Sequence, residues 1–260
     1  MKHLNTLFFS LTSLLFLVCS PVNVQAQQKV PLAVQTITYA QHTFDVCVVD
    51  LNQHQIDLHL EKKDGRKYRS ISKLLQNLHD QDNKPLMITN AGMYLPHKDN
   101  EPQGLYVSNG IERDPLNLRD TTVFLNFYLK PNGVFLLTDD GGMVVESEKY
   151  PAVAAQKKVR LATQSGPMLV IDGQLHPKFN ADSKSTYIRS GVGVLPNGQL
   201  AFVISNERVN FYTFAKVFQE ILACKNALYL DGAISKMYLP QLKRFDLGGN
   251  FGGMLSVSPK

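Results

Sequence analysis

The chain has 260 residues, of which 44% are hydrophobic and 19% are charged, and its formal net charge is +5 at pH 7. This composition is typical of a globular protein with a large core and excludes a disordered or fibrous chain. The basic residues are scattered, apart from a short run at residues 62–69, so we do not expect a nucleic-acid-binding protein.

The first 26 residues have the pattern of a cleavable export signal. Lys2 and His3 give a basic start, residues 7–18 an apolar core, and residues 24–26 a cleavage site flanked by small side chains. We therefore predict a mature protein of residues 27–260 that is periplasmic or secreted. No later segment reaches about 18 uninterrupted apolar residues, so we expect no membrane span in the mature chain.

Two cysteines, Cys47 and Cys224, lie beyond the predicted signal. An exported compartment permits a disulfide between them, and two separate buried thiols are the alternative. The histidines do not supply the spacing of a metal site, since His97 and His176 stand alone in predicted loops. We predict no metal and no organic cofactor.

The first part of the mature chain predicts strands and one helix. Apolar and polar residues alternate over residues 34–60, which is typical of β-strands. Residues 70–79 have helical spacing of isoleucine and leucine, with Ser70 in the position of an N-cap. Residues 86–89 form a short apolar strand that leads into Asn90-Ala91-Gly92.

The later part predicts short strands, turns and one further helix. A hairpin is expected between residues 123–129 and 134–137, because Pro131-Asn132-Gly133 separates them. A helix is expected over residues 211–223. Further strands are predicted at residues 104–107, 168–171, 191–195, 200–204 and 227–230. The pattern predicts a single α+β domain dominated by antiparallel or mixed β-sheet, with a few packed helices.

Several predicted strands begin or end at a polar residue followed by glycine. The clearest case is residues 227–238, ALYLDGAISKMY, where an apolar strand ends at Asp231-Gly232. Each such step alone is an ordinary turn. If the strand ends converge, they form one concave site. The other steps are Asn90-Ala91-Gly92, Ser165-Gly166-Pro167 and Arg189-Ser190-Gly191, together with Ser205-Asn206-Glu207-Arg208, which is polar but has no glycine.

The order of these blocks resembles the phosphodiester glycosidase family. The blocks are NAGMY, QGLYVSNG, QSGPMLVIDGQL, RSGVGV, VNFYTFAKVF and ALYLDGAISKMY, which run from about residue 90 to about residue 240. The family includes the uncovering enzyme, which removes N-acetylglucosamine from a phosphodiester on lysosomal enzymes. The chain is most similar to the bacterial exported branch of the family, long without a known function.

This resemblance implies hydrolysis of a sugar 1-phosphodiester, a small or polymeric sugar phosphate being the substrate. Arg189 would then hold the phosphate through its fork of donors, and Asp231 would be the catalytic carboxylate, as base or nucleophile. A phosphate leaving group needs little protonation, which weakens the usual need for two facing carboxylates. Glu207 is the candidate if a second one is used, whereas Asp172 is interpreted as part of a hairpin turn.

The remaining candidate residues would bind substrate. Asn90 is a candidate ligand for a sugar hydroxyl or phosphate oxygen, and an Asx-turn is its alternative. Gly92, Gly166 and Gly232 would allow close approach or shape the pocket, and Ser235 would offer a hydroxyl or cap the next residues. The chain departs from the uncovering enzyme after Gly232, where Ala233-Ile234 replaces a run of glycines, so its pocket and substrate are expected to differ.

Two other functions fit the same sequence. The first is a non-catalytic glycan- or envelope-binding protein that uses the same cleft, and the second is a structural envelope protein whose polar turns are only turns. The residues give no prediction of oligomeric state.

Overall fold

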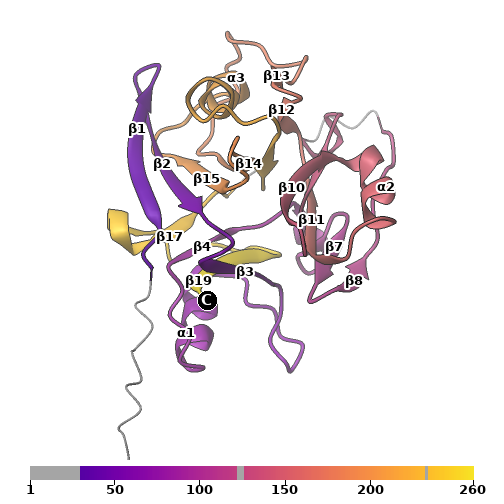
Figure 1. Cartoon of the computed structure of the whole chain (residues 1–260), viewed down its shortest axis with the longest axis vertical. Coiled ribbons are helices and arrows are strands. Elements are labelled where there is room, and N and C mark those ends of the chain that lie inside the picture. Colours follow the sequence, from indigo (N-terminus) through magenta and orange to yellow (C-terminus); the bar gives the residue numbers. More distant parts are fainter. Residues whose placement is uncertain (1–29, 122–125, 232–233) are drawn as a thin grey trace, which may run out of the picture.

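In a computed structural model, residues 30–121, 126–231 and 234–260 are described, so the predicted export signal lies outside the described part. Three β-sheets make up most of the molecule (Figure 1). The strand pairings of the described residues are all antiparallel. Together with a few short helices, they confirm the predicted β-rich α+β class.

The largest sheet has the strand order β1-β2-β15-β14-β16-β12-β13. Its strands are β1 (Ala33–Tyr39), β2 (His42–Val49), β15 (Leu200–Ser205), β14 (Ser190–Val194), β16 (Ala227–Leu230), β12 (Met168–Ile171) and β13 (Gln174–Leu175). β14 and β16, which carry two of the predicted polar steps, are direct neighbours near its centre.

Two five-stranded sheets lie beside it, together with a small β5–β6 hairpin. The second sheet consists of β10 (Gly141–Glu146), β9 (Gly133–Thr138), β11 (Val159–Ser165), β7 (Tyr106–Ser108) and β8 (Ile111–Asp114). The third consists of β18 (Arg244–Phe245), β17 (Met237–Leu239), β4 (Met87–Asn90), β19 (Met254–Pro259) and β3 (His54–His59). The hairpin pairs β5 (Tyr94–Leu95) with β6 (Glu101–Pro102).

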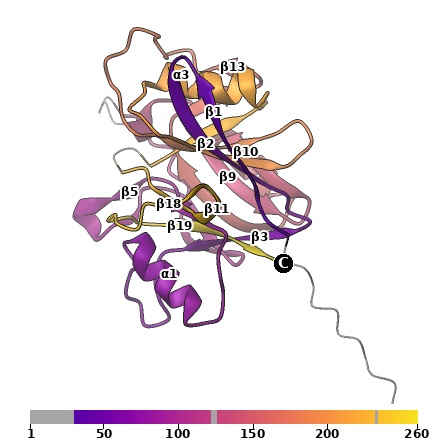
Figure 2. The same ribbon diagram turned by 90° about the vertical axis from the view of Figure 1, so that its left-hand side faces the viewer.

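The helices lie on the outside of this arrangement. They are α1 (Ile71–His79), α2 (Tyr150–Ala154) and α3 (Phe211–Lys216), with α3 continued by a π-helical turn (Val217–Ile221). Figure 2 shows α3 and α1 at opposite ends of the molecule, with the sheets between them. In the part of the chain described, no helix combines the length and the apolar character that a membrane crossing needs.

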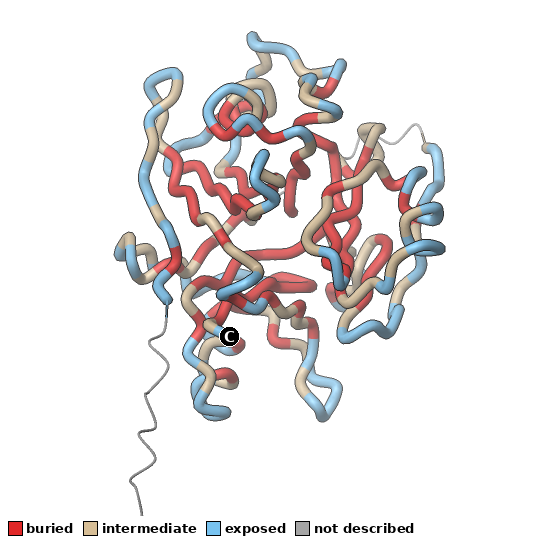
Figure 3. Tube along the Cα trace, viewed as in Figure 1, coloured by how far each residue is buried: buried red, intermediate tan, exposed pale blue. Residues whose placement is uncertain are grey.

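The central strands of the large sheet are buried, as their colour in Figure 3 shows, whereas the edge strand β1 has no buried residue. One face packs on α3 through Phe214 and Phe218, and the other packs on the second and third sheets through side chains such as Phe202 and Leu230. Strands that are covered on both faces have continuously apolar sequences. This explains why ALYL in β16 has no alternation.

The predicted helices are confirmed, and their N-caps are visible. The Ser70 hydroxyl accepts a hydrogen bond from the Lys73 amide (3.4 Å) at the start of α1. The Asn210 side chain accepts one from the Thr213 amide (2.9 Å) at the start of α3. Such caps satisfy backbone donors that a helix start leaves free.

The predicted hairpin through Pro131-Asn132-Gly133 is wrong. Asn126–Tyr128 form a 3₁₀ turn rather than the end of a strand, and residues 122–125 lie outside the described part. The Asn132 side chain donates to the Phe127 carbonyl (2.8 Å), which holds this segment as a loop. β9 instead forms its hairpin with β10.

Cys47 and Cys224 are free and buried. Burial raises the pKa of each thiol to about 12. Of the two alternatives for the cysteines, the structure therefore has two separate thiols.

The connection from β4 to β5 is held closely against β11. The Gly92 amide donates to the Thr163 hydroxyl (3.1 Å), and a Cβ at Gly92 would overlap the Gln164 carbonyl and that hydroxyl. Only glycine fits between these two segments, and the contact fixes the direction in which the chain leaves β4.

We predict that Gly92→Ala destabilises the protein by about 3 kcal/mol, because backbone must move to admit a methyl group. Gly248→Ala is the matched control, since a Cβ there meets nothing within 4 Å, and it should change stability by less than about 0.5 kcal/mol. Urea unfolding monitored by circular dichroism measures both. Equal stability of the two variants would contradict this packing.

Candidate functional site

The polar steps predicted from the sequence meet at one end of the large sheet. Ser190 pairs with Leu230 of β16 on one side and with Ile204 of β15 on the other. Arg189, one residue before, therefore lies beside the end of β16, where Asp231 follows. The Tyr229 amide donates to the Pro167 carbonyl (3.2 Å), which brings the Ser165-Gly166-Pro167 step to the same end.

Arg189 is completely buried at the entry to β14. Its Nε donates to the Val209 carbonyl (2.8 Å) and its Nη2 to the Ser185 carbonyl (2.9 Å). Nη1 makes no well-formed hydrogen bond to a described residue. Burial lowers the pKa of Arg189, opposed by the nearby Tyr229 phenol, but a guanidinium remains charged in proteins. Its hydrogen bonds to neutral carbonyls leave Nη1 without a well-formed partner, but the side chain has no exposed surface and lies against the Tyr229 phenol, so its contact with a phosphate stays a prediction.

Aromatic rings hold this guanidinium on one face. Arg189 Cζ lies 3.6 Å from the centre of the Phe211 ring, close enough for a cation–π contact. The stack continues from Phe211 to Phe179 (5.1 Å between ring centres, 5° between planes) and from Phe179 to His176 (4.8 Å, 22°). The side chain of Arg189 therefore has little freedom to move.

Asp231 is 6% exposed and has a left-handed backbone, with φ of 32°. Few residues other than glycine adopt this region, and aspartate and asparagine are enriched among those that do. Its charge helps to raise the pKa of two tyrosines, after burial as the larger cause. These are Tyr94, at the start of β5, and Tyr229, in β16, so the carboxylate lies within electrostatic reach of both phenols.

Asn90 and Ser235 join a hydrogen-bond network centred on Ser190. Asn90 Nδ2 donates to Ser190 Oγ (2.9 Å), and Ser190 Oγ lies 3.0 Å from Ser235 Oγ. The Lys236 amide donates to Asn90 Oδ1 (3.1 Å). Asn90 thus ties the segment that follows Asp231 to the ends of β4 and β14. With Asn90 only 1% exposed, its observed partners are structural, and its contact with substrate stays a prediction.

The three predicted glycines differ in their surroundings. The space beside the Gly92 Cα is occupied by β11, as described above. At Gly166, a Cβ would lie 2.7 Å from Asn132 Cβ, so this glycine allows the loop before β9 to pack closely. Gly232 lies outside the described residues. Ile234 packs against the apolar cluster under α1, so the side chain that distinguishes this sequence from the glycine run has a place in the core.

Glu207 is not brought together with Asp231. It is exposed and lies on the side of β15 that faces β2, where it accepts from the Thr43 amide (2.7 Å) and the Thr43 hydroxyl (2.9 Å). The hydrogen bond from the Thr43 amide lowers the pKa of Glu207. A carboxylate held ionised and turned to another strand is poorly placed to act as the second acid.

Two residues that sequence reasoning gave no role belong to this site. Ser190 is the centre of the buried network, and Tyr229 contacts Arg189, with 5.3 Å from Arg189 Cζ to the ring centre. Tyr229 carries the only polar side-chain group in the ALYL run, and this was the one feature of the sequence that could have pointed to it. Ser165 is a third polar residue there; its buried Oγ has no hydrogen bond to a described residue.

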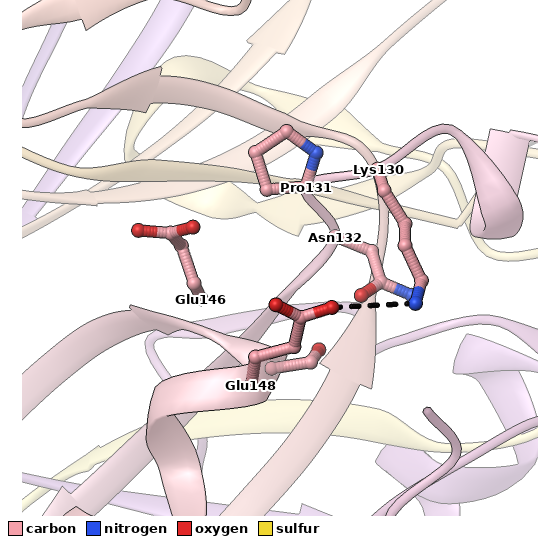
Figure 4. A pocket seen from close by; sticks show the side chains of 6 residues that line it. Lys130, Pro131, Asn132, Glu146 and Glu148 are labelled. Carbon is pink, nitrogen blue, oxygen red and sulfur yellow. Dashed lines mark hydrogen bonds and ion pairs between the residues drawn. The ribbon is translucent and has the colours of Figure 1, made fainter. Parts of the chain in front are cut away.

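Surface cavities are present near this region, and one of them shares Asn132 with the packing around Gly166. The one in Figure 4, of about 260 Å³, is lined by Lys130, Pro131, Asn132, Glu146, Ser147 and Glu148. A Lys130–Glu148 ion pair (3.4 Å) crosses it. Among the described residues no group of three or more His, Cys, Asp or Glu side chains could hold a metal ion, and the sequence prediction of no metal stays a prediction.

A buried guanidinium with an available donor, next to a strand-end carboxylate, is typical of a site for a ligand that carries negative charge. A family model described as phosphodiester glycosidase matches residues 83–251. The uncharacterized protein YigE of Escherichia coli (strain K12) is 31% identical over 237 residues, which are 91% of this chain and 86% of YigE. The chain belongs to the phosphodiester glycosidase family, which confirms the resemblance seen in its sequence.

Solved structures agree on the fold. The catalytic domain of zebrafish N-acetylglucosamine-1-phosphodiester alpha-N-acetylglucosaminidase, auto-inhibited by its pro-peptide, is similar with a TM-score of 0.60 at 14% identity, covering 88% of this chain and 82% of that one. A hypothetical protein from Synechocystis has a TM-score of 0.55 at 12% identity, covering 88% and 62%. At such identities the likeness establishes the fold alone.

We predict that His176 makes the protein sensitive to acid. Burial lowers its pKa to about 4, below the value of about 6.5 in an unfolded chain. Because the folded form prefers the neutral ring, stability is complete above pH 6.5 and falls as the pH drops towards 4. The loss should approach about 3 kcal/mol.

The measurement is urea unfolding at pH 7 and pH 4.5. His176→Asn keeps an acceptor for the Lys178 amide and should lose less stability than the wild type between these two pH values. His79→Asn, an exposed control, should behave as the wild type. The same pH dependence in His176→Asn and wild type would show that another group is responsible.

Proposed function

We propose that the chain is an exported hydrolase that cleaves a sugar 1-phosphodiester, with Arg189 holding the phosphate and Asp231 as the catalytic carboxylate. Membership of the phosphodiester glycosidase family supports the class of reaction. The observation that carries the residue assignment is the buried Arg189, whose Nη1 has no well-formed hydrogen bond to a described residue, beside the strand that delivers Asp231.

The proposed reaction requires a cation that stabilises the phosphate and a carboxylate that acts at the anomeric carbon. Hydrolysis forms a bond from a water oxygen to the anomeric carbon and breaks the bond from that carbon to a phosphate oxygen, which leaves with the electron pair. The positive charge of Arg189 would stabilise the negative charge that collects on the phosphate. Asp231 would accept the proton of the attacking water, or attack the anomeric carbon itself.

One carboxylate is enough for this leaving group. A phosphate monoester departs as a stable anion, so it needs less protonation than a sugar alkoxide, and the displacement of Glu207 towards β2 does not weaken the proposal. The Ser165 hydroxyl, buried at the same sheet end without a hydrogen bond to a described residue, is a further donor for a phosphate oxygen.

The test is release of free sugar from UDP-N-acetylglucosamine and from glucose 1-phosphate diesters by the purified mature protein. Asp231→Asn should lower kcat at least about 100-fold, since it removes the base or nucleophile. Asp172→Asn is the matched control, because Asp172 also precedes a glycine at a strand end and has a left-handed φ of 46°. It should retain wild-type activity.

Arg189→Met should raise KM and lower kcat, whereas Arg208→Met, at an exposed neighbouring arginine, should change neither by more than about threefold. Circular dichroism establishes that each variant is folded. Saturable sugar binding without turnover would favour the glycan-binding alternative. Full activity in folded Asp231→Asn would rule out the assigned role of Asp231.

A further inference from the structure

The strand β1 (Ala33–Tyr39) forms one edge of the large sheet, and no strand among the described residues pairs with its outer side. In Figure 1 it is the outermost strand on the left of the molecule. Its seven residues pair with β2 without a register shift, so the strand has no bulge. The large sheet therefore ends in a long, regular strand that is open to solvent.

The turn between β1 and β2 decides which backbone groups point outward. Ala40 and Gln41 form a two-residue turn with left-handed φ values of 48° and 64°, as in a type I′ hairpin. In such a hairpin the two residues that flank the turn exchange both of their hydrogen bonds, and every second pair beyond them does the same. Tyr39 and His42 flank this turn, so the odd-numbered residues of β1 bond to β2.

The even-numbered residues of β1 therefore present their backbone N–H and C=O groups at the free edge. These residues are Val34, Thr36 and Thr38, and no backbone hydrogen bond to a described residue reaches them there. The same alternation on β2 turns the backbone of Thr43 towards β15, and the Thr43 carbonyl indeed accepts from the Asn206 amide (2.9 Å).

The other sheet edges of the described residues are short, charged, interrupted by glycine or already occupied. The strands β13, β18, β5 and β6 have two residues each, β8 (IERD) carries three charges, and β10 (GGMVVE) begins with two glycines and ends at a glutamate. Along β3, Arg160 Nη2 donates to the Ile56 carbonyl (2.9 Å) and the Ser108 hydroxyl to the Leu58 carbonyl (3.0 Å). By contrast β1 (AVQTITY) has no charge and no proline, the features that usually prevent pairing at an edge.

We propose that β1 pairs with β1 of a second copy of this chain, antiparallel and about a two-fold axis at Thr36. In this register Thr36 lies opposite the partner's Thr36, and Val34 and Thr38 lie opposite the partner's Thr38 and Val34. The three pairs would exchange about six backbone hydrogen bonds, and the two large sheets would become one continuous antiparallel sheet.

The match of this edge to itself is what favours a second copy as the occupant. The outward groups are symmetric about Thr36, so a two-fold axis satisfies those of both chains at once. The strand is uncharged, and no like charges within it would meet across the axis. β-branched side chains at all three outward positions suit a paired strand.

The molecule itself holds this edge in place from both faces of the sheet. On one face the 3₁₀ turn Pro240–Leu242 lies near β1, where Leu242 and Val34 pack on the same core cluster. On the other face the Tyr39 hydroxyl donates to Glu220 (2.7 Å) of the π-helical turn. A strand supported in this way is ordered before it meets a partner, which lowers the entropy cost of association.

The candidate site lies elsewhere in the same sheet. β2 and β15 separate β1 from β14 and β16, which carry Arg189 and Asp231 at their ends. Pairing at β1 leaves that site uncovered, and the inference does not depend on any reaction.

The test is sedimentation equilibrium of residues 27–260 over a range of concentrations. The wild type should have the mass of one chain at about 1 µM and approach that of two chains at about 500 µM, as expected for a small interface. Thr36→Pro removes an outward N–H without removing a hydrogen bond to β2, a position where an edge strand tolerates proline. It should stay a single chain at both concentrations.

Thr36→Val is the matched control. Both Thr36 variants lose the hydroxyl that donates to Asp45 (2.7 Å), but valine keeps the backbone N–H, so Thr36→Val should associate as the wild type does. Thr36→Lys gives a second variant if proline disturbs the fold, because it places two like charges directly opposite each other. It should weaken association at least about tenfold. Circular dichroism establishes that each variant is folded.

Amide hydrogen exchange locates the contact. At about 500 µM the amides of Val34, Thr36 and Thr38 should exchange at least about tenfold more slowly than at about 1 µM. The amides of Gln35 and Ile37, which bond to β2, should be protected at both concentrations. A wild type that remains a single chain at the higher concentration would overturn the proposal. So would a dimer in which the three outward amides stay unprotected, or a folded Thr36→Pro that associates like the wild type.

Discussion

The arrangement of the candidate site depends on one buried positive charge, that of Arg189 at the entry to β14. Moving a guanidinium from water into the protein interior costs free energy unless its charge is stabilised and its donors form hydrogen bonds. Here the Arg189 side chain is completely buried, bonded to two backbone carbonyls and stacked on Phe211. These contacts stabilise the cation, although Nη1 makes no well-formed hydrogen bond to a described residue. The π-system of Phe211 and the neutral ring of His176 further along the stack are compatible with such a charge.

The neighbouring strands place the other polar side chains of the candidate site around this cation. β16 brings Tyr229 and then Asp231 beside it, and the Ser190 network binds the segment after Asp231 to β4. The close contact of Gly92 with β11 directs the chain from β4 towards Tyr94. Packing between the sheets therefore determines where the carboxylate lies. A site so enclosed exposes little charge to solvent, which strengthens the electrostatic interactions among its own residues.

Much of the fold could be predicted because the signals were local. Helical spacing with Ser70 before it, and apolar runs bounded by turns at residues 200–204 and 227–230, became α1, β15 and β16. The hairpin through Asn132 failed because a side-chain hydrogen bond to Phe127 stabilises a loop that composition alone does not reveal. For the site, polar steps at strand ends pointed to Arg189 and Asp231, which strand pairing brings side by side, and their roles in catalysis stay predictions. Contacts between segments distant in the sequence decided that Asn90 bonds Ser190 in another sheet and that Glu207 turns to Thr43 on the neighbouring strand of its own sheet. No pattern along the chain encodes such pairing.

Calorimetric titration with N-acetylglucosamine 1-phosphate and with N-acetylglucosamine tests most directly whether the buried guanidinium is a phosphate site. The phosphorylated sugar should bind the wild-type protein at least about tenfold more tightly than the plain sugar, and this advantage should disappear in folded Arg189→Met. If the two sugars bind equally well, or if Arg189→Met keeps the preference for phosphate, Arg189 does not hold the phosphate of the substrate.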